Sequence, residues 1–382
     1  DARKEGRALR KNVFTGKNLL NTLLFQIFFD CFNCLFIAFI AKEVEPRLFL
    51  TAGILASISP LLIIISSQIL SDTIFLFFFN LYILFFLKFI NKKYIFNICC
   101  SAVFLGISVF IRATSFPLIA GTVIILFFIV KKPFSIKYFL TIGLFFIFST
   151  LPVFDRISNN FKNYQTFSLT TQTGSHLAYW VVPGVLDFYD EQELNNYQKK
   201  LNKVNKEIEK KIEPFASSKL LSSLSFEILG SSDILHLSLA WGKGAFLNLF
   251  SPPILLDKRI RALKHPSFYE SNRNITIWLK KIFENKKYSK YKYSLIAMLL
   301  TSVFFFVLLF IGLIKMYYIN KGLLLLSLCL ITYFFILTGP VFSPKYIFPI
   351  ISILIIAESI ALKTLLERFL FIFQRKKNSI NY

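Results

Sequence analysis

Long apolar blocks separated by short polar turns run along most of this chain. Nine blocks stand out, at residues 19–41, 48–66, 73–90, 95–111, 116–130, 139–154, 294–314, 322–338 and 347–366. Most are close to the ~20 residues that a helix needs to cross the ~30 Å hydrocarbon core of a membrane. Apolar and polar positions do not alternate in them as they do in a membrane β-barrel. The pattern predicts an all-α polytopic membrane protein with about nine transmembrane helices.

One polar stretch, 155–293, separates the sixth block from the seventh and is large enough to form a domain. Its first part, 156–186, has β-branched residues, Ser and Gly, which predicts short strands. Glu and Lys at helical spacing in 190–213 predict a solvated helix, and 217–256 resembles a helix in the membrane interface. We therefore expect an α/β-containing loop domain. The expected organisation is an amphipathic outer-loop tail (1–18), six membrane helices (19–154), the loop domain (155–293), three membrane helices (294–366) and a basic cytoplasmic tail (367–382).

The positive charge of the chain predicts its orientation. Lys and Arg total 44, and the formal net charge is +23. If 42–47 is cytoplasmic, the outer short turns hold only two cations, Arg112 and Lys345. The cytoplasmic turns and the tail then hold the other cations: Lys42, Arg47, Lys88, Lys92, Lys93, Lys131, Lys132, Lys137, Lys315, Lys321, Lys363, Arg368, Arg375, Lys376 and Lys377. Short cytoplasmic loops are enriched in cations, so the long loop is expected outside. These cations are typical of segments that interact with anionic lipid headgroups. The sequence does not show the interleaved basic and aromatic residues that form a nucleic-acid-binding groove.

Three outer turns carry polar residues that membrane insertion does not explain. Asp72 ends the turn 66–72, Arg112 lies in the next outer turn, and Lys345 and Tyr346 lie in the third. Cations at the interface suit a phosphate, and a carboxylate can act as a base or orient a hydroxyl. Two plainer interpretations stay open. Asp72 suits a helix N-cap, and the two cations suit anchors to lipid headgroups.

Two further acids, Asp30 and Glu358, lie inside apolar blocks. Ionisable residues within membrane spans are costly and often functional. Hydrogen bonding within the helix bundle is the simpler explanation for both. The histidines, His176, His236 and His265, show no metal-binding spacing, so we expect no cofactor, although a divalent metal stays open.

Four motifs together resemble a known family. They are Ser59-Pro60 followed by Ser71-Asp72-Thr73-Ile74-Phe75, the segment Gly106–Pro117 around Arg112, the outer-loop segment Asn163–Gly174, and Pro344-Lys345-Tyr346-Ile347-Phe348-Pro349. This set is similar to the membrane-embedded C-type glycosyltransferases, the group around the dolichyl-phosphate-mannose protein mannosyltransferases and the bacterial lipid A aminoarabinose transferases. The resemblance extends over most of the chain.

The resemblance implies an enzyme that moves a sugar from a polyprenyl-phosphate donor to a lipid, glycan or protein acceptor on the outer face of the membrane. Family members carry their catalytic acid in the first outer loop, after a first helix that this sequence does not match. Residues 1–18 then correspond to the tail of that loop, with Asp1 and Glu5 as candidate bases, and a base upstream of Asp1 is an alternative. Asp72 matches a position where relatives often carry an acid. Lys345 stands where many relatives have Arg, which keeps the charge without the bidentate geometry.

The expected function is therefore a glycosyltransferase whose catalytic acids are Asp1, Glu5 and Asp72 and whose donor phosphate is bound by Arg112, Lys345 and Tyr346. The expected location is an integral position in a bacterial inner membrane, with the active site outside. A lipid-linked-sugar flippase or other transporter is the main alternative, although transporters usually show broken helices in matched halves, and no repeat is visible here. A polymerase or ligase of lipid-linked glycans and a non-catalytic membrane scaffold also stay open.

Overall fold

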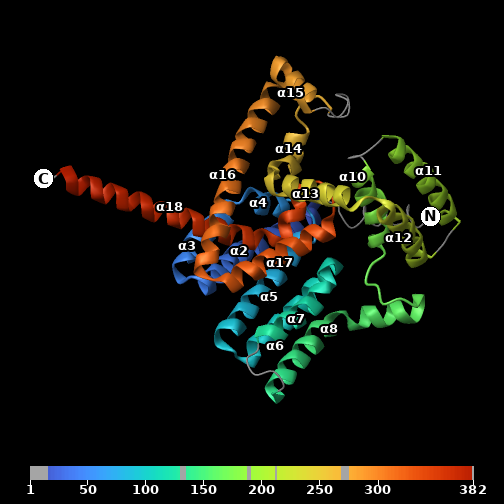
Figure 1. Cartoon of the computed structure of the whole chain (residues 1–382), viewed down its shortest axis with the longest axis horizontal. Helices are drawn as coiled ribbons and strands as arrows, with labels where there is room; N and C mark the ends of the chain where they lie inside the picture. The colour runs from blue at the N-terminus through green and yellow to red at the C-terminus, as the bar shows by residue number, and fades with distance from the viewer. Residues whose placement is uncertain (1–15, 130–134, 187–190, 211–212, 268–274, 381–382) are drawn as a thin grey trace. The chain divides into compact units, whose positions relative to one another are not determined.

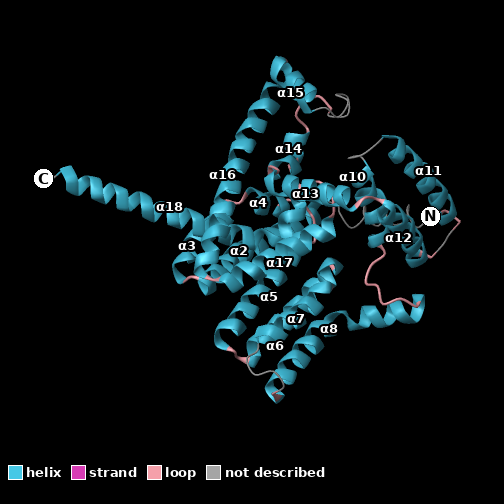
Figure 2. Ribbon diagram, viewed as in Figure 1, coloured by secondary structure: helices cyan, strands magenta, loops and turns pink. Residues whose placement is uncertain are grey.

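The computed structural model describes residues 16–129, 135–186, 191–210, 213–267 and 275–380, and these fold into helices joined by short connections (Figures 1 and 2). Packing divides the chain into two compact units, which are described one at a time. Unit 1 consists of the described residues up to Phe77 together with Leu249–Ser327 and the residues from Ile347 onward. Unit 2 consists of Phe78–Asn248 and Leu328–Tyr346.

Unit 1 contains the first apolar helices and two of the last three. Its helices are α2 (Gly16–Val44), η1 (Pro46–Leu48), α3 (Phe49–Ser57), α4 (Pro60–Ser66), η4 (Pro253–Leu256), α14 (Lys258–Arg261), α15 (Ile275–Glu284), η6 (Lys286–Tyr288), α16 (Ser289–Ile319) and α18 (Ile351–Ile380). Within this unit α2 packs on α3, and α18 packs on both α3 and α16.

Unit 2 contains the middle apolar helices and the helices of the long loop. They are α6 (Ile95–Ile111), η2 (Ala113–Ser115), α7 (Pro117–Ile129), α8 (Ile136–Tyr164), α9 (Gln172–His176), the π-helical turn η3 (Leu177–Val181), α10 (Val182–Leu186), α11 (Glu191–Ile208) and α12 (Pro214–Ser231). Four elements have residues in both units: α5 (Asp72–Lys92), α13 (Ile234–Phe250), α17 (Lys321–Thr338) and η7 (Pro344–Ile350). In unit 2, α8 packs along α6 and α7 (Figure 1), and α12 packs on α9.

The helical membrane class is supported, but the count of nine spans is not. Six helices in the described part of the chain are long and apolar enough to cross a membrane, and a seventh span results if α3 and α4 are taken together. Block 48–66 is broken because Pro60 interrupts it, and its two halves are bent by 53°. The 17 residues of α6 reach about 26 Å at 1.5 Å per residue, short of a ~30 Å core. The helix Ala113–Phe128, which covers most of block 116–130, is also too short.

The strands expected in 156–186 are wrong, and so is the α/β description of the loop. No strand occurs among the described residues (Figure 2). Instead α8 continues out of its apolar block to Tyr164, where Gln165 ends it in the left-handed region at φ 53°. The Thr and Ser residues that follow bond to their own neighbourhood: Thr166 Oγ1 accepts from Ser168 N and Thr170 Oγ1 from Gln172 N, both at 3.2 Å. Such local bonds compete with strand pairing.

Glycine lets helices approach closely at the centre of each unit. A Cβ at Gly106 in α6 would lie 2.4 Å from the Ser149 carbonyl oxygen of α8, and one at Gly312 in α16 would lie 1.9 Å from the Ala357 carbonyl oxygen of α18. Small residues at helix crossings are the usual device for packing within membranes. The second of these crossings lies directly beside Glu358, the buried acid of α18.

Candidate functional site

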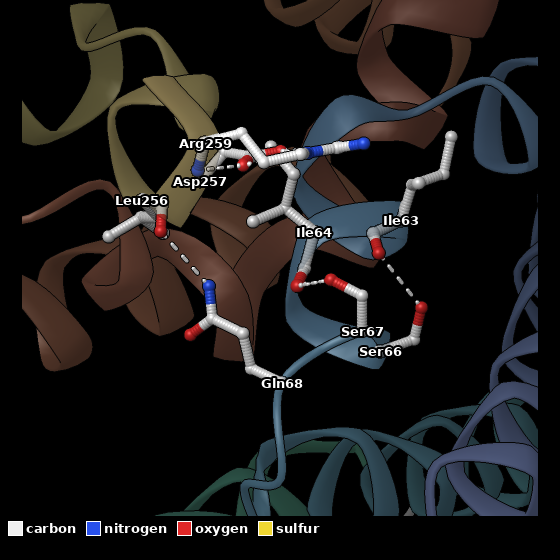
Figure 3. A network of polar contacts seen from close by, with 8 residues as sticks. All are labelled: Ile63, Ile64, Ser66, Ser67, Gln68, Leu256, Asp257 and Arg259. Atoms are coloured by element: carbon white, nitrogen blue, oxygen red, sulfur yellow. Dashed lines mark hydrogen bonds and ion pairs between the residues drawn. The ribbon is translucent and has the colours of Figure 1, made fainter. Parts of the chain in front are cut away.

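The turn between α4 and α5 carries the acid Asp72, and polar contacts hold its first half (Figure 3). At the end of α4 the hydroxyls of Ser66 and Ser67 donate to the carbonyls of Ile63 and Ile64, at 3.1 and 2.7 Å. Gln68 Nε2 donates to the Leu256 carbonyl of η4, at 3.1 Å. The turn is therefore fixed to the segment that follows α13.

That following segment is itself capped by an acid. Asp257 Oδ1 accepts from the backbone N–H of Arg259 at 2.7 Å, and Oδ2 accepts from the Arg259 guanidinium at 2.6 Å (Figure 3). The Arg259 hydrogen bonds hold the pKa of the Asp257 carboxyl below its ordinary value and raise that of the guanidinium. Asp257 thus acts as the N-cap of α14, and its charge is already matched.

A polar stripe on α2 faces the second half of the turn. Gln26, Asp30 and Asn33 are spaced four and three residues apart, so they share one helix face. The Gln26 amide donates to the Leu70 carbonyl, and Asn33 Nδ2 donates to the Thr73 carbonyl at 3.2 Å. All three side chains are buried. The stripe therefore holds the backbone on both sides of Asp72.

The buried polar groups of this stripe are not fully satisfied. Asp30 lies within hydrogen-bonding reach of the side chains of Asn33 and Ser66, yet its Oδ1 has no partner. Gln26 Oε1 and Thr73 Oγ1 are also buried without a partner. Orphaned buried oxygens cost free energy, and here two lie on the α2 stripe and one, that of Thr73, lies at the start of α5.

Asp72 lies in the first turn of α5, where the helix dipole favours a negative charge. Only 3% of the residue is exposed. The dipole supports the simple interpretation of the acid as a helix-start residue. In this conformation the carboxylate is closed off from solvent.

The second predicted turn places Arg112 at the end of α6. Arg112 leaves the helix in an extended conformation and its backbone N–H still bonds to the Ser108 carbonyl. The turn is fixed by the Tyr333 hydroxyl of α17, which donates to the Thr114 carbonyl. Ser115 is fully buried, and its hydroxyl has no partner.

The third turn, 339–346, is held by helices of the long loop. Asn248 of α13 donates to the Val341 carbonyl at 2.9 Å and accepts from the Ser343 N–H at 2.8 Å. Gly339 has φ 70°, a conformation that favours glycine, and a Cβ there would lie 3.1 Å from Val181. The backbone before Lys345 is thereby set by one buried and one half-buried hydrogen bond and by a tight turn.

Arg112 and Tyr346, both predicted to bind the donor phosphate, belong to unit 2. An electrostatic interaction links the guanidinium to the tyrosine. The ring of His176, from α9, stands edge-on to the Tyr346 ring at 6.4 Å between centroids, and its Nε2 lies 3.2 Å from the Thr338 carbonyl. Lys345 is half-buried and makes no hydrogen bond or ion pair with the described residues. Unit 2 therefore assembles a guanidinium, a phenol and an imidazole, with a lysine beside the tyrosine in the chain.

The other predicted site residues do not all lie in one described unit. Asp1 and Glu5 lie outside the described residues. Asp72 belongs to unit 1, whereas Arg112, Lys345 and Tyr346 belong to unit 2. No group of three His, Cys, Asp or Glu side chains suited to a metal occurs where the structure is described.

Sequence reasoning missed several polar residues of these clusters. His176 and Asn248 reach the third turn from distant loop helices, and no local pattern announces such contacts. The α2 stripe had a visible signal, because three polar residues on one face of an apolar helix predict a buried polar contact.

The loop helices of unit 2 also enclose a cavity of about 390 Å³. Its polar lining residues are Glu193, Asn196, Lys200, Ser231, Ser232, Asp233 and His236. Beneath it Tyr197 is 1% exposed and donates to the Ala178 carbonyl at 2.8 Å. Burial raises the pKa of Tyr197 to about 12, so its hydroxyl stays protonated and structural. The cavity has the size of a small ligand site.

Comparisons with protein-family models, with curated proteins and with solved structures found no match. What this structure defines is a class, a helical polytopic membrane protein with six long apolar helices in its described residues.

Proposed function

We propose that this protein is a membrane glycosyltransferase that moves a sugar from a polyprenyl-phosphate donor to a lipid, glycan or protein acceptor on the outer face of the membrane. The observation that supports this most is the cluster of Arg112, Tyr346 and His176 in unit 2. A guanidinium with a neighbouring hydroxyl and imidazole suits a phosphate. The motifs around Arg112 and Tyr346 are also those that resemble the C-type glycosyltransferases.

The proposed roles follow from the chemistry of each side chain. Arg112 and Lys345 bind the donor phosphate and stabilise the negative charge that develops as it leaves. Tyr346 donates a hydrogen bond to a phosphate oxygen. Asp72 positions the acceptor hydroxyl or shares the base role, and Asp1 or Glu5 deprotonates it.

The test of the proposal is sugar transfer in a defined system. Purified full-length protein in proteoliposomes receives a radiolabelled polyprenyl-phosphate sugar and a mixture of candidate acceptors. For Arg112→Ala we expect a loss in kcat/KM of about 10²–10³, the usual effect of removing one donor to a developing oxyanion. Lys315→Ala is the matched control, because Lys315 is a cation near the end of α16 that has no assigned role at the donor phosphate. Equal loss in both variants, or full activity in Arg112→Ala, refutes the assigned role.

A lipid-linked-sugar flippase or other transporter is the alternative function. The specific observation in its favour is the span that is bent by 53° between α3 and α4, because transporters commonly use broken helices. A flipping assay with a fluorescent lipid-linked sugar separates the two functions. Translocation without any transferred product favours the transporter, and transferred product without translocation favours the transferase.

A further inference from the structure

Glu358 is an isolated acid inside a membrane helix of unit 1. It lies in the candidate span Pro344–Phe371 and is 8% exposed. Within the described residues its carboxylate has no hydrogen-bond or ion-pair partner. Burying an ionised carboxylate without a partner inside a membrane helix costs too much free energy for that state to persist. A proton or a cation must therefore neutralise it.

A cavity of about 70 Å³ adjoins this carboxylate. Its wall is mostly apolar, but it includes the hydroxyl residues Ser59, Ser251, Thr301 and Ser302, and Glu358 is the one titratable residue among those that line it. A water needs roughly 10–15 Å³ measured in this way. The space accommodates a small ion with accompanying water. All lining residues belong to unit 1.

The cavity also borders the break between α3 and α4. Ser59 and Pro60 form that break, and both line the cavity. Pro60 has no amide hydrogen, so the helix cannot continue its bonding, and the Ala56 carbonyl accepts from Ser59 N at 3.1 Å instead. Broken membrane helices characteristically present backbone oxygens to bound cations. The carboxylate, the hydroxyls and the helix break thus meet at one place.

We propose that this cavity binds a monovalent metal cation, Na⁺, through the Glu358 carboxylate, the Ser59 and Ser302 hydroxyls and backbone oxygens at the helix break, in competition with a proton. Oxygen donors suit a hard cation, and one carboxylate matches one positive charge. Divalent cations in proteins generally take more carboxylates or keep several waters. This site is independent of sugar transfer, so its test does not depend on the proposed function.

The test uses a hydrophobic carbodiimide, which modifies a carboxyl group within a membrane protein when that group is protonated. Purified full-length protein in detergent is treated in choline chloride or in NaCl, and the adduct is mapped by mass spectrometry. We expect modification of Glu358 in choline and about tenfold less in NaCl at roughly ten times the dissociation constant. KCl should protect less than NaCl at equal concentration.

Matched variants assign the effect to this cavity. Glu358→Gln removes the adduct, and Ser302→Ala raises the NaCl concentration needed for protection. Asp30 is the internal control, because it is equally buried in unit 1 but does not line the cavity. Any modification of Asp30 should be indifferent to NaCl. Protection of Asp30 and Glu358 alike would contradict a specific site.

A second measurement covers the case in which Glu358 resists modification. Binding to the folded state raises the unfolding temperature, so we expect Tm to rise by about 2–5 °C in NaCl relative to choline. The rise should be absent in Glu358→Gln and reduced in Ser302→Ala. Modification that NaCl does not alter overturns the proposal and leaves a proton as the only occupant. An unmodified Glu358 with the same Tm in both salts overturns it as well.

Discussion

Replacing Gly312 by alanine tests the close crossing of α16 and α18. The new Cβ would lie 1.9 Å from the Ala357 carbonyl oxygen and 2.4 Å from its carbonyl carbon. Ordinary contact begins near 3.4 Å, so α16 and α18 must separate by about 1.5 Å along the contact. Both obstructing atoms belong to the backbone, and no side-chain rotation relieves them. Overpacking typically costs about 1–3 kcal/mol, and we expect a value near 3 kcal/mol here.

The control for this variant is Gly121→Ala in α7. A Cβ at Gly121 meets nothing within 4 Å. Alanine is favoured over glycine inside a helix by about 0.5–1 kcal/mol, so this variant should be neutral or slightly more stable. Because both changes add the same methyl group to a helix, their difference isolates the cost of the crossing.

The assay is equilibrium unfolding of the two variants and the parent in mixed detergent micelles, with the midpoint and slope recorded for each. We expect Gly312→Ala to unfold at a lower denaturant concentration than the parent and Gly121→Ala to match or exceed it. Indistinguishable midpoints for the two variants would show that α16 and α18 do not cross as closely as described.

Three further changes probe other contacts. Glu45→Gln should cost about 1 kcal/mol through the loss of its ion pair with the half-buried Lys363; a double-mutant cycle with Lys363→Met that shows no coupling would contradict the pair. Asn248→Ala leaves a buried carbonyl and N–H unsatisfied and should cost about 2–4 kcal/mol; limited proteolysis of the turn after α17 should accelerate, whereas Asn196→Ala should not accelerate it. Because its pKa is lowered in the folded state, the Asp257 carboxylate stabilises the fold above its unfolded pKa, and this stabilisation is lost as the pH falls through the folded pKa. The protection factors of the α14 amides, which correct for the pH dependence of intrinsic exchange, should therefore fall below about pH 4 in the parent, and this fall should be absent in Asp257→Asn.

The sequence predicted the helical membrane class because the thickness of the membrane core sets the number of consecutive apolar residues in a spanning helix. It overcounted the spans because average hydropathy ignores local geometry. Pro60 hardly changes the apolar character of block 48–66, yet it removes an amide hydrogen and bends the helix. The strands failed for a related reason. Thr166 and Thr170 raise β-propensity in the sequence, but their hydroxyls accept hydrogen bonds in local turns, and the described residues contain no strand for them to pair with.

Only those residues of the candidate site that have a local signal in the sequence could be predicted. Arg112 and Tyr346 each interrupt an apolar pattern at a turn, and in unit 2 the guanidinium interacts electrostatically with the tyrosine. His176 and Asn248 contribute through contacts across 162 and 93 residues of sequence. A single sequence contains no information on such pairs, because their side chains look like ordinary loop residues. His176 and Asn248, which lie on helices of the long loop, are therefore the residues of the site that the hydrophobic pattern did not predict.

The burial of Asp72 narrows what this acid can do. A carboxylate that is 3% exposed cannot meet an acceptor hydroxyl in the conformation described. The backbone on either side of it is held by the amides of Gln26 and Asn33. A movement of the turn that exposes the acid and releases one of these bonds costs about 0.5–1.5 kcal/mol for that bond. That cost is small enough for substrate binding to supply. In the proposed transferase, Asp72 is therefore better suited to positioning an acceptor after such a movement than to acting as a permanently poised base.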